Sequence, residues 1–346
     1  MTFNHIFRRF MSVTIKSIAA EAGVSFQAVS AVLNNKTTSR VSPAKRQRIL
    51  DIADKLGYKV NFGYKIMHGH KTHTVGIISA MRKLENDAHI RKLILELMQR
   101  LNLSGYSTYF NNMMTLDGDA NLAQIRELIS RGTEHFIFIG SPRGHEMIEE
   151  EIIRKKCTII GWNSYFKRNL HTDSCSASAE LQRFLHGKSG MIPRLMMSGE
   201  KYFVDSRFTA LRTFYPEMSD DEIWDEYVIQ VPKLQWDESD FSAKAFELGY
   251  NGIEQCLKKN PEVRAVACYT DYFALGAAAW CNKNGLTVGK DIYLAGFNNV
   301  DAVRFYSHPI SSAEHPINES IEILLREMDK ETPFCEKIDI NVVLRS

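Results

Sequence analysis

Residues 22–35 have the sequence AGVSFQAVSAVLNN, a glycine turn followed by a short helical pattern with two unlike faces. Gly23 is a residue type that permits positive φ, and Ser25 is a candidate N-cap for a helix that begins at Phe26. Val29 and Val32 recur at helical spacing, which predicts a face buried in a small core. The remaining positions predict an outward face with an aromatic ring, an amide and a hydroxyl: Phe26, Gln27, Ser30, Ala31 and Asn34.

The segments on either side of this helix complete a three-helix pattern. Apolar residues at helical spacing predict a first helix of about two turns from Ile15 to Ala22. Ser42 followed by Pro43 is a typical helix start, and the apolar stripe after it predicts a third helix. Two short helices joined by a glycine turn and supported by a third form a helix-turn-helix unit, whose polar face meets base edges and phosphates. A helix face that is merely solvated is the alternative.

The charge of the chain is distributed unevenly, and this favours the DNA-binding interpretation. The 346 residues have a formal net charge of +2. Residues 12–74 hold ten Lys or Arg and three Asp or Glu, a balance of +7, and residues 1–11 add two arginines, so residues 75–346 carry −7. A basic head on an acidic body indicates that a polyanion such as nucleic acid binds the head.

One nearly continuous motif, VTIKSIAAEAGVSFQAVSAVLNN followed by RVSPAKRQRILDIADKLGYKVN, runs from Val13 to Asn61. It resembles the operator-binding domain of the lac repressor (LacI/GalR-type) family. The resemblance implies that Phe26 and Gln27 occupy the base-reading positions of the recognition helix. A glutamine can pair with an adenine edge, and an aromatic ring can pack on a thymine methyl. The phosphate-binding positions implied in the same way are Ser25, Ser30 and Asn34.

The segment FGYKIMHGHKTHT, residues 62–74, matches the hinge of that family. The resemblance implies a short helix that forms on the operator and places Met67 in the minor groove as an apolar wedge. Val60, Gly63 and Tyr64 depart from the family pattern, and a linker without DNA contact is the alternative. The histidines of this segment lack the spacing that would place three imidazoles on one helix face, so no metal site is predicted.

These patterns predict the organisation and the compartment of the chain. We expect a disordered extension at 1–12, a helix-turn-helix domain at 13–60, a hinge at 61–73 and an effector-binding and dimerisation domain at 74–346. No apolar run follows MTFNHIFRRF, so a signal peptide is not expected, and no run reaches the ~20 residues of a membrane span. The six scattered cysteines predict reduced thiols in a cytoplasmic protein.

From residue 74 onward, short apolar runs alternate with helical stretches. TVGIISA, GYSTYFN, HFIFIG, CTIIGW, PRLMMSG, EYVIQV, VRAVACYT and DIYLAGF are the predicted strands. This alternation predicts parallel sheets covered by helices on both faces, with a ligand site at the carboxyl ends of the strands. We find no G-x-G-x-x-G after a strand, no Walker loop and no nucleophile elbow, so no nucleotide cofactor and no enzyme is predicted.

The body also contains motifs with a family resemblance: SGEKYFVDSRFTALRTF, YTDYFALGAAAW and DIYLAGFNNVDAVRFYSHPISS. They resemble the effector domain of the same family, which is similar to periplasmic sugar-binding proteins of type I. The implied fold is two α/β lobes joined by three crossovers, near 172, 298 and 328, with a ligand cleft between the lobes. The helical stretches HIRKLILELMQRL and AAAWCNKNG are the expected dimerisation faces, with packing inside their own lobes as the alternative.

Carried over residue by residue, the resemblance implies five effector contacts. Arg207 is the foremost, because a planar guanidinium suits sugar hydroxyls or a carboxylate; a surface ion pair is the alternative. Asn298 stands where relatives usually have Asp, which removes a charge and disfavours a cationic ligand. Asp271 and Asp173 are also implied effector contacts, and for each of them helix capping is the alternative. Trp236 would supply an aromatic platform, with core packing as the alternative.

The function predicted from these features is a homodimeric transcriptional regulator, usually a repressor, whose operator affinity is set by a small ligand such as a sugar. Each head would read one half-site of double-stranded operator DNA. Three other classes stay open: a sugar-binding protein without DNA function, a carbohydrate-active enzyme, and an architectural DNA-binding protein that ignores ligands.

Overall fold

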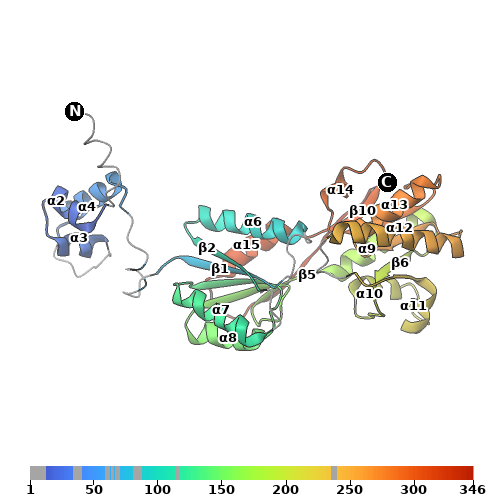
Figure 1. The fold of residues 1–346 in the computed structure, drawn as a ribbon, viewed down its shortest axis with the longest axis horizontal. Coiled ribbons are helices and arrows are strands. Elements are labelled where there is room, and N and C mark those ends of the chain that lie inside the picture. The colour runs from blue at the N-terminus through green and yellow to red at the C-terminus, as the bar shows by residue number, and fades with distance from the viewer. Residues whose placement is uncertain are drawn as a thin grey trace. The chain divides into compact units, whose positions relative to one another are not determined.

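The computed structural model describes residues 13–33, 41–58, 63, 66, 71–80, 88–113, 117–234 and 240–345. The chain divides into two compact units, Met1–Thr72 and His73–Ser346 (Figure 1). This division lies one residue from the predicted limit between hinge and body. The predicted extension at 1–12, together with Asn34, Met67 and Trp236, lies outside the described residues.

The N-terminal unit contains three helices, at the positions that the sequence predicts. They are α2 (Ile15–Ala22), α3 (Phe26–Leu33) and α4 (Pro43–Lys55). A capping box formed by Thr14 and Ser17 begins α2, and Gly23 ends it with φ of +66°. The helices share a small core: Ile18, Ala19, Ala22, Val29, Val32, Ile49 and Ala53. The predicted helix-turn-helix is therefore confirmed, with its apolar stripes facing inward.

The first lobe of the body contains a six-stranded parallel sheet with the strand order β11-β5-β4-β3-β1-β2. Helices α6 (Ala88–Leu103) and α15 (Ile317–Glu327) cover one face, and α7 (Gly118–Ser130) and α8 (His145–Arg154) cover the other (Figure 1). The strands are β1 (Thr74–Ser79), β2 (Ser107–Asn112), β3 (His135–Ile139), β4 (Thr158–Trp162), β5 (Asn169–Asp173) and β11 (Cys335–Asp339).

The second lobe repeats this plan with the strand order β12-β10-β9-β8-β6-β7, in which the described β10–β12 pair is antiparallel. The strands are β6 (Arg194–Ser198), β7 (Val228–Val231), β8 (Ala265–Cys268), β9 (Tyr293–Phe297), β10 (Ile310–Glu314) and β12 (Asn341–Val343). One face is covered by α12 (Phe241–Lys259) and α13 (Asp271–Lys283), the other by α9 (Ser174–Ser189), α10 (Ser206–Arg212) and α11 (Asp220–Tyr227). The short α14 (Asp301–Arg304) follows β9.

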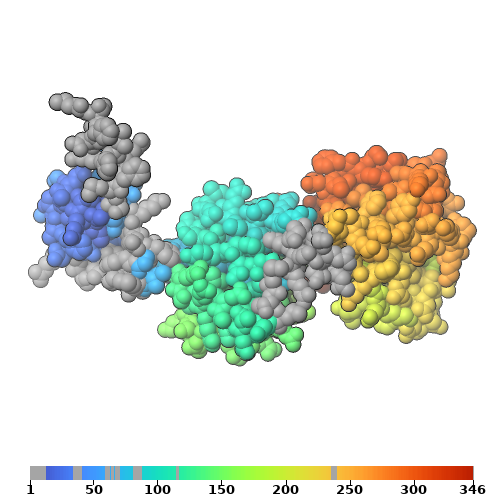
Figure 2. Space-filling model, in the orientation of Figure 1, coloured from blue at the N-terminus to red at the C-terminus, as the bar shows by residue number. Residues whose placement is uncertain are grey.

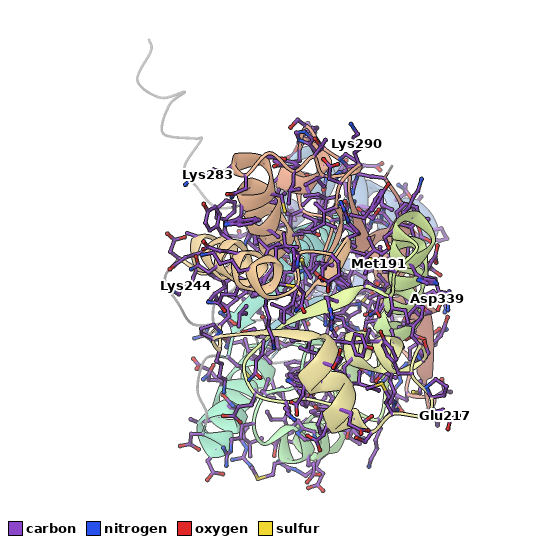
Figure 3. All side chains as sticks on the ribbon, turned by 90° about the vertical axis from the view of Figure 1, so that its right-hand side faces the viewer. Met191, Glu217, Lys244, Lys283, Lys290 and Asp339 are labelled. Atoms are coloured by element: carbon purple, nitrogen blue, oxygen red, sulfur yellow. The ribbon has the colours of Figure 1, made fainter. Side chains whose placement is uncertain are left out.

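In the space-filling view the first lobe, in cyan and green, lies beside the second lobe, in yellow to red (Figure 2). The view onto the second lobe places the charged side chains of Lys283 and Lys290 at its periphery (Figure 3). All six cysteines are free thiols. Among the described residues, no helix is both long and apolar enough to span a bilayer.

Three crossovers join the lobes, and two of them differ from the predicted positions. The chain first crosses where β5 ends at Asp173, as predicted. It crosses back at His315–Pro316, between β10 and α15, and a third time at Ile340, between β11 and β12. The predicted crossovers near 298 and 328 are wrong. After β9 the chain forms α14 and then β10, which pairs with β9, so it is still in the second lobe at 298. At 328 it is within the first lobe, between α15 and β11.

The two stretches expected to form dimerisation faces supply much of the core of their own lobes. On α6, Leu93, Ile94 and Leu97 are buried in the first lobe, whereas Leu95 is exposed. On α13, Ala277, Ala278 and Cys281 are buried in the second lobe. A Cβ atom added at the preceding Gly276 would lie 2.0 Å from the carbonyl oxygen of Phe246 on α12, so the two helices are in close backbone contact. The apolar character of these stretches therefore has an explanation within one chain.

Candidate DNA-reading surface and inter-lobe cleft

The start of α3 presents the residues predicted to read DNA. The Ser25 hydroxyl accepts a hydrogen bond from the Ala28 amide at 3.2 Å, which confirms its capping role. Val29 and Val32 are fully buried beneath the helix, so their burial fixes its orientation. Phe26 is 47% exposed and Gln27 is also exposed. The ring and the amide thus project side by side from the first turn, while Ser30 is half-buried.

Several cations of the N-terminal unit keep their charge available. Lys16, Lys45 and Arg48 are exposed and form no ion pair within the described residues. Lys55 pairs with Glu21 at 3.3 Å, in a contact that is open to solvent on both sides. Exposed cations that form no ion pair within the protein can neutralise DNA phosphates. This releases the counterions condensed on the DNA and favours binding.

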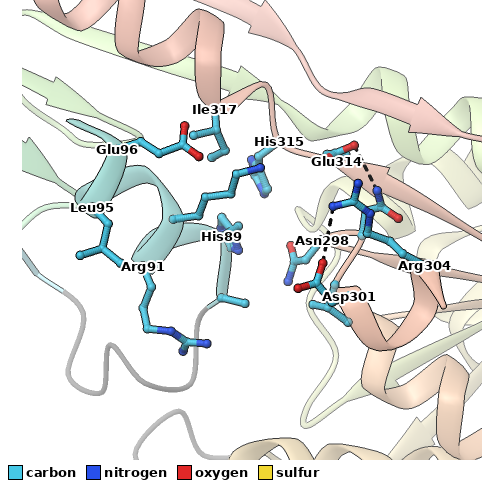
Figure 4. Close-up of a pocket in the computed structure, with 14 residues that line it drawn as sticks. His89, Arg91, Leu95, Glu96, Asn298, Asp301, Arg304, Glu314, His315 and Ile317 are labelled. Atoms are coloured by element: carbon cyan, nitrogen blue, oxygen red, sulfur yellow. Dashed lines mark hydrogen bonds and ion pairs between the residues drawn. The ribbon is translucent and has the colours of Figure 1, made fainter. Parts of the chain in front are cut away.

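A cleft lies between the two lobes of the body and is formed by three adjoining cavities. The cavity beside α6 has a volume of about 520 Å³ (Figure 4). From the first lobe it is lined by α6 residues such as His89, Arg91 and Glu96, and from the second by the segment after β9, including Asn298, Asp301 and Arg304. An inner cavity of about 260 Å³ shares His89, Asn298 and His315 with it. A third, of about 580 Å³, adjoins the inner cavity through Thr172, Ser174 and Arg207.

The inner cavity lies at the carboxyl ends of strands from both sheets, as the alternating pattern predicts. From the first lobe, Asn163 follows β4, and Thr172 lies at the end of β5. From the second lobe, Tyr269 and Thr270 follow β8, and Asn298 follows β9. A ligand of this cavity would therefore touch both lobes, and its binding would depend on their arrangement.

Arg207 lies on the wall of the inner cavity, at the start of α10. Its guanidinium contacts two rings, with its central carbon 4.5 Å from the centre of Tyr269 and 4.4 Å from that of Phe297. Its Nη1 donates to Asp205 at 3.2 Å, and Asp205 also caps α10 by accepting from the Arg207 amide at 2.8 Å. Arg207, predicted as an effector contact, thus lines the inner cavity, and its ion pair with Asp205 is largely buried rather than at the surface.

Two histidines that the sequence analysis missed meet in the cleft. The rings of His89, on α6, and His315, at the second crossover, stack with centres 4.2 Å apart and planes within 5° of parallel. Trp162 and Phe297 lie close to His315. Burial lowers the pKa of His315 well below its ordinary value, and the nearby His89 and Arg207 lower it further.

Asparagines and a threonine supply neutral polar groups to the same cavity. Asn163 exchanges hydrogen bonds with Thr172: its side-chain amide donates to the Thr172 hydroxyl at 2.9 Å, and its oxygen accepts from the Thr172 amide at 2.8 Å. Asn298 has a φ of +95°, a conformation that asparagine tolerates better than most residues. The predicted Asn298 therefore reaches the cavity, although it is not at a crossover.

The prediction that Asp271 contacts the effector is corrected by its burial. Its side chain is completely buried, accepts from the Val300 amide at 2.7 Å and from the Ser312 hydroxyl at 2.6 Å, and does not line the cleft. Burial raises the pKa of Asp271 to about 7. A Cβ atom added at Gly296 would lie 2.2 Å from its Oδ1, so the glycine makes room for the carboxylate. Asp271 joins α13 to the loop after β9 and to β10.

Asp173 is at the first crossover, on the outer side of the cleft. It caps α9 by accepting from the Cys175 amide at 2.8 Å and pairs with Lys337 at 2.7 Å. It lines the third cavity but not the inner one. The contacts of Asp173 are therefore those of a helix cap, the alternative to an effector contact.

The comparisons with known proteins agree with both units. Residues 14–61 match the family model described as bacterial regulatory proteins, lacI family, and residues 221–345 match that of the periplasmic binding protein-like domain. HTH-type transcriptional regulator RegA of Clostridium saccharobutylicum is 23% identical over 96% of this chain and 97% of its own. Catabolite control protein A of Priestia megaterium is 22% identical over 93% of this chain and 94% of its own. The structure of the lac repressor dimer bound to operator and the anti-inducer ONPF superposes with a TM-score of 0.71 at 17% identity, covering 97% of this chain and 98% of that one.

A helix-turn-helix head followed by a two-lobed α/β body with a cleft defines a DNA-binding transcriptional regulator, and not an enzyme. The head is therefore a DNA-binding domain of the lacI type, and the body is a periplasmic binding protein-like domain.

Proposed function

We propose that the protein is a cytoplasmic, homodimeric repressor that reads a near-palindromic operator and changes its operator affinity when a sugar or sugar derivative binds between the lobes. The observation that carries this proposal is the exposed pair Phe26 and Gln27 at the start of α3, above the fully buried Val29 and Val32. The packed core beneath α3 holds the exposed ring and amide in place, as a DNA-recognition surface requires.

In this proposal Gln27 pairs with an adenine edge and Phe26 packs on a thymine methyl, while Ser25, Ser30 and Asn34 hold phosphates. A good bidentate contact discriminates by about 1–3 kcal/mol per base. Met67, in a hinge at 61–73, would open a base step in the minor groove. Two-fold symmetry would set the spacing of the half-sites, and the lac repressor crystallised on its operator as a dimer supports that arrangement.

Ligand binding in the cleft would act through the relative arrangement of the lobes. The inner cavity takes residues from both lobes, so a ligand stabilises the arrangement in which they come together. A coupling of about 1–3 kcal/mol between cleft and head gives a 5–150-fold change in operator affinity. Arg207 and Asn298 are the proposed contacts from the second lobe, joined by Asn163 and Thr172 from the first.

A sugar-binding protein without DNA function is the rival that the cleft alone would allow. The intact three-helix core counts against it, as do the exposed Lys16, Lys45 and Arg48, which form no ion pair within the described residues. An architectural DNA-binding protein would have the head but no use for a cleft that is lined by polar residues from two lobes.

Selection of bound duplexes from a random pool by the purified full chain tests the proposal. We expect a near-palindromic consensus with A·T pairs at the positions that Gln27 and Phe26 face. A pool that remains random after selection would reject the regulator and favour the sugar-binding rival. A consensus whose affinity no small molecule alters would instead favour the architectural protein.

A further inference from the structure

We propose that the ligand of the cleft carries an oxyanion, a carboxylate or a phosphoryl group, which binds between the guanidinium of Arg207 and the N-terminus of α13. The inference rests on the proposed function and narrows its ligand from sugars in general to acidic sugar derivatives. Three independent features of the inner cavity carry it.

The first feature is the Nε of Arg207, a buried donor without a hydrogen-bond partner among the described residues. Asp205 occupies Nη1, and the central carbon of the guanidinium lies 4.5 Å from the ring centre of Tyr269 and 4.4 Å from that of Phe297. The Nε–Nη2 edge of a guanidinium is a planar fork of two donors, which matches the two oxygens of a carboxylate or phosphate. Because its ring contacts and its ion pair hold the group in place, little conformational freedom is lost when an anion binds.

The second feature is the N-terminus of α13, a helix of thirteen residues. Its N-cap residue Thr270 lines the inner cavity, is 3% exposed and has a buried hydroxyl without a hydrogen-bond partner. The hydroxyl makes no capping bond to its own helix. Asp271, in the first turn, directs its carboxylate to Val300 and Ser312 instead. A buried donor without an acceptor is costly, and an oxyanion at this position would supply the acceptor.

The third feature is the charge of the wall. Among the described residues that line the inner cavity there is no Asp or Glu, and the ionisable groups are Arg207, Tyr269, His89 and His315. Asn298 contributes an amide at the end of β9 rather than a carboxylate. An anion therefore meets no carboxylate on the described wall of the inner cavity, and Asp205, beside that cavity, is already paired with Arg207. The asparagine amides and Thr172 supply groups that can bind hydroxyls.

The test measures the melting temperature of the full chain, at fixed ionic strength adjusted with sodium chloride, against rising D-glucose, D-gluconate, D-glucose 6-phosphate and inorganic phosphate. We expect saturable stabilisation by at least one anion, with an affinity at least tenfold higher than that of D-glucose. Stabilisation by gluconate alone identifies a carboxylate ligand, and stabilisation by the two phosphate compounds identifies a phosphoryl ligand.

Two variants connect the effect to the cavity. Arg207→Lys keeps the charge but loses the fork, and should weaken anion binding at least tenfold. Thr270→Val removes the unpartnered hydroxyl, so it should raise the melting temperature of the free protein by about 2 °C while it weakens anion binding. Arg212→Lys, on the same helix but paired with Asp220 at the surface, is the matched control and should bind the anion as the unmodified chain does.

The inference is overturned if glucose stabilises as well as the anions, if no anion stabilises more than chloride, or if Arg207→Lys and Thr270→Val leave anion binding unchanged. The last outcome would mean that the anions bind elsewhere on the surface. Specific operator binding, measured on the same preparations without ligand, separates these results from a failure of the proposed function.

Discussion

The DNA-reading surface and the inter-lobe cleft are assembled in opposite ways. Phe26 and Gln27 are neighbours in sequence and project from the first turn of one helix, so a local helix alone brings them together. The inner cavity takes Asn163, Thr172, Arg207, Thr270 and Asn298 from five separate segments and two lobes. A contiguous surface can change its specificity without affecting the fold. In an assembled cleft, each residue depends on the packing of the strands and helices that carry it.

The largest effect expected from this difference is on the stability of the body. Gly276→Ala would place a Cβ atom 2.0 Å from the Phe246 carbonyl oxygen and force α12 and α13 apart, at a cost of roughly 3 kcal/mol or more. All four tryptophans lie in residues 73–346, so denaturant unfolding followed by tryptophan fluorescence reports on the body.

Gly187→Ala is the matched control for this substitution. Gly187 is exposed on α9 and has open space around it, so the added methyl group should stabilise the body by about 0.5–1 kcal/mol. Equal unfolding midpoints for the two variants would contradict the close contact of α12 and α13.

In the head, Gln27→Ala should lower the preference for the selected operator by roughly 30-fold or more, because one bidentate base contact, of about 1–3 kcal/mol, is lost in each half-site. Binding to a shuffled duplex should change by less than about threefold, since phosphate contacts remain. Fluorescence anisotropy with both duplexes measures the ratio. Gln47→Ala, an exposed glutamine on α4, is the control; equal losses on both duplexes for Gln27→Ala would show that Gln27 does not read bases.

In the cleft, Asn298→Asp adds a carboxylate to the wall of the inner cavity. An anion that binds there should lose at least about tenfold in affinity, because a like charge now lies near it. Calorimetric titration of the full chain with the best-binding anion measures this loss. Unchanged or tighter binding would remove Asn298 from the site.

The last expected effect, the smallest within a single pH unit, is a pH dependence of the stability of the body. Burial raises the pKa of Asp271 to about 7, so between pH 5 and 7 the folded body holds a proton that the unfolded chain has released. Its contribution to stability is therefore complete below pH 4 and lost as the pH rises through 7, with a slope of at most about 1.4 kcal/mol per pH unit. Asp271→Asn should flatten this part of the stability profile measured by denaturant unfolding. A variant profile as steep as that of the unmodified chain would contradict the assignment.

The same contrast explains what the sequence could predict. The helices of the head and eight strands of the body carry strong local signals, in helical spacing or in apolar runs such as HFIFIG. Strands β5, β11 and β12 were missed because their sequences, NLHTD, CEKID and NVV, are short or polar. In addition, β11 and β12 pair with β5 and β10 only because the chain crosses between the lobes.

The cleft was predicted in part, for the same physical reason. Arg207 and Asn298 were found through a family motif. His89 and His315, 226 positions apart, meet only because the chain returns to the first lobe at residue 315, and no local pattern carries that information. Asp271 was misassigned because its place at a helix start is visible in the sequence, whereas its burial against Gly296 depends on the neighbouring strand.

The ratio between the affinities of the full chain for its selected operator and for a shuffled duplex of equal length, at physiological ionic strength, tests the account most directly. We predict a preference of at least about a thousandfold, as is typical of specific regulators. Equal affinities for the two duplexes would contradict the assignment of Phe26 and Gln27 as readers of DNA sequence.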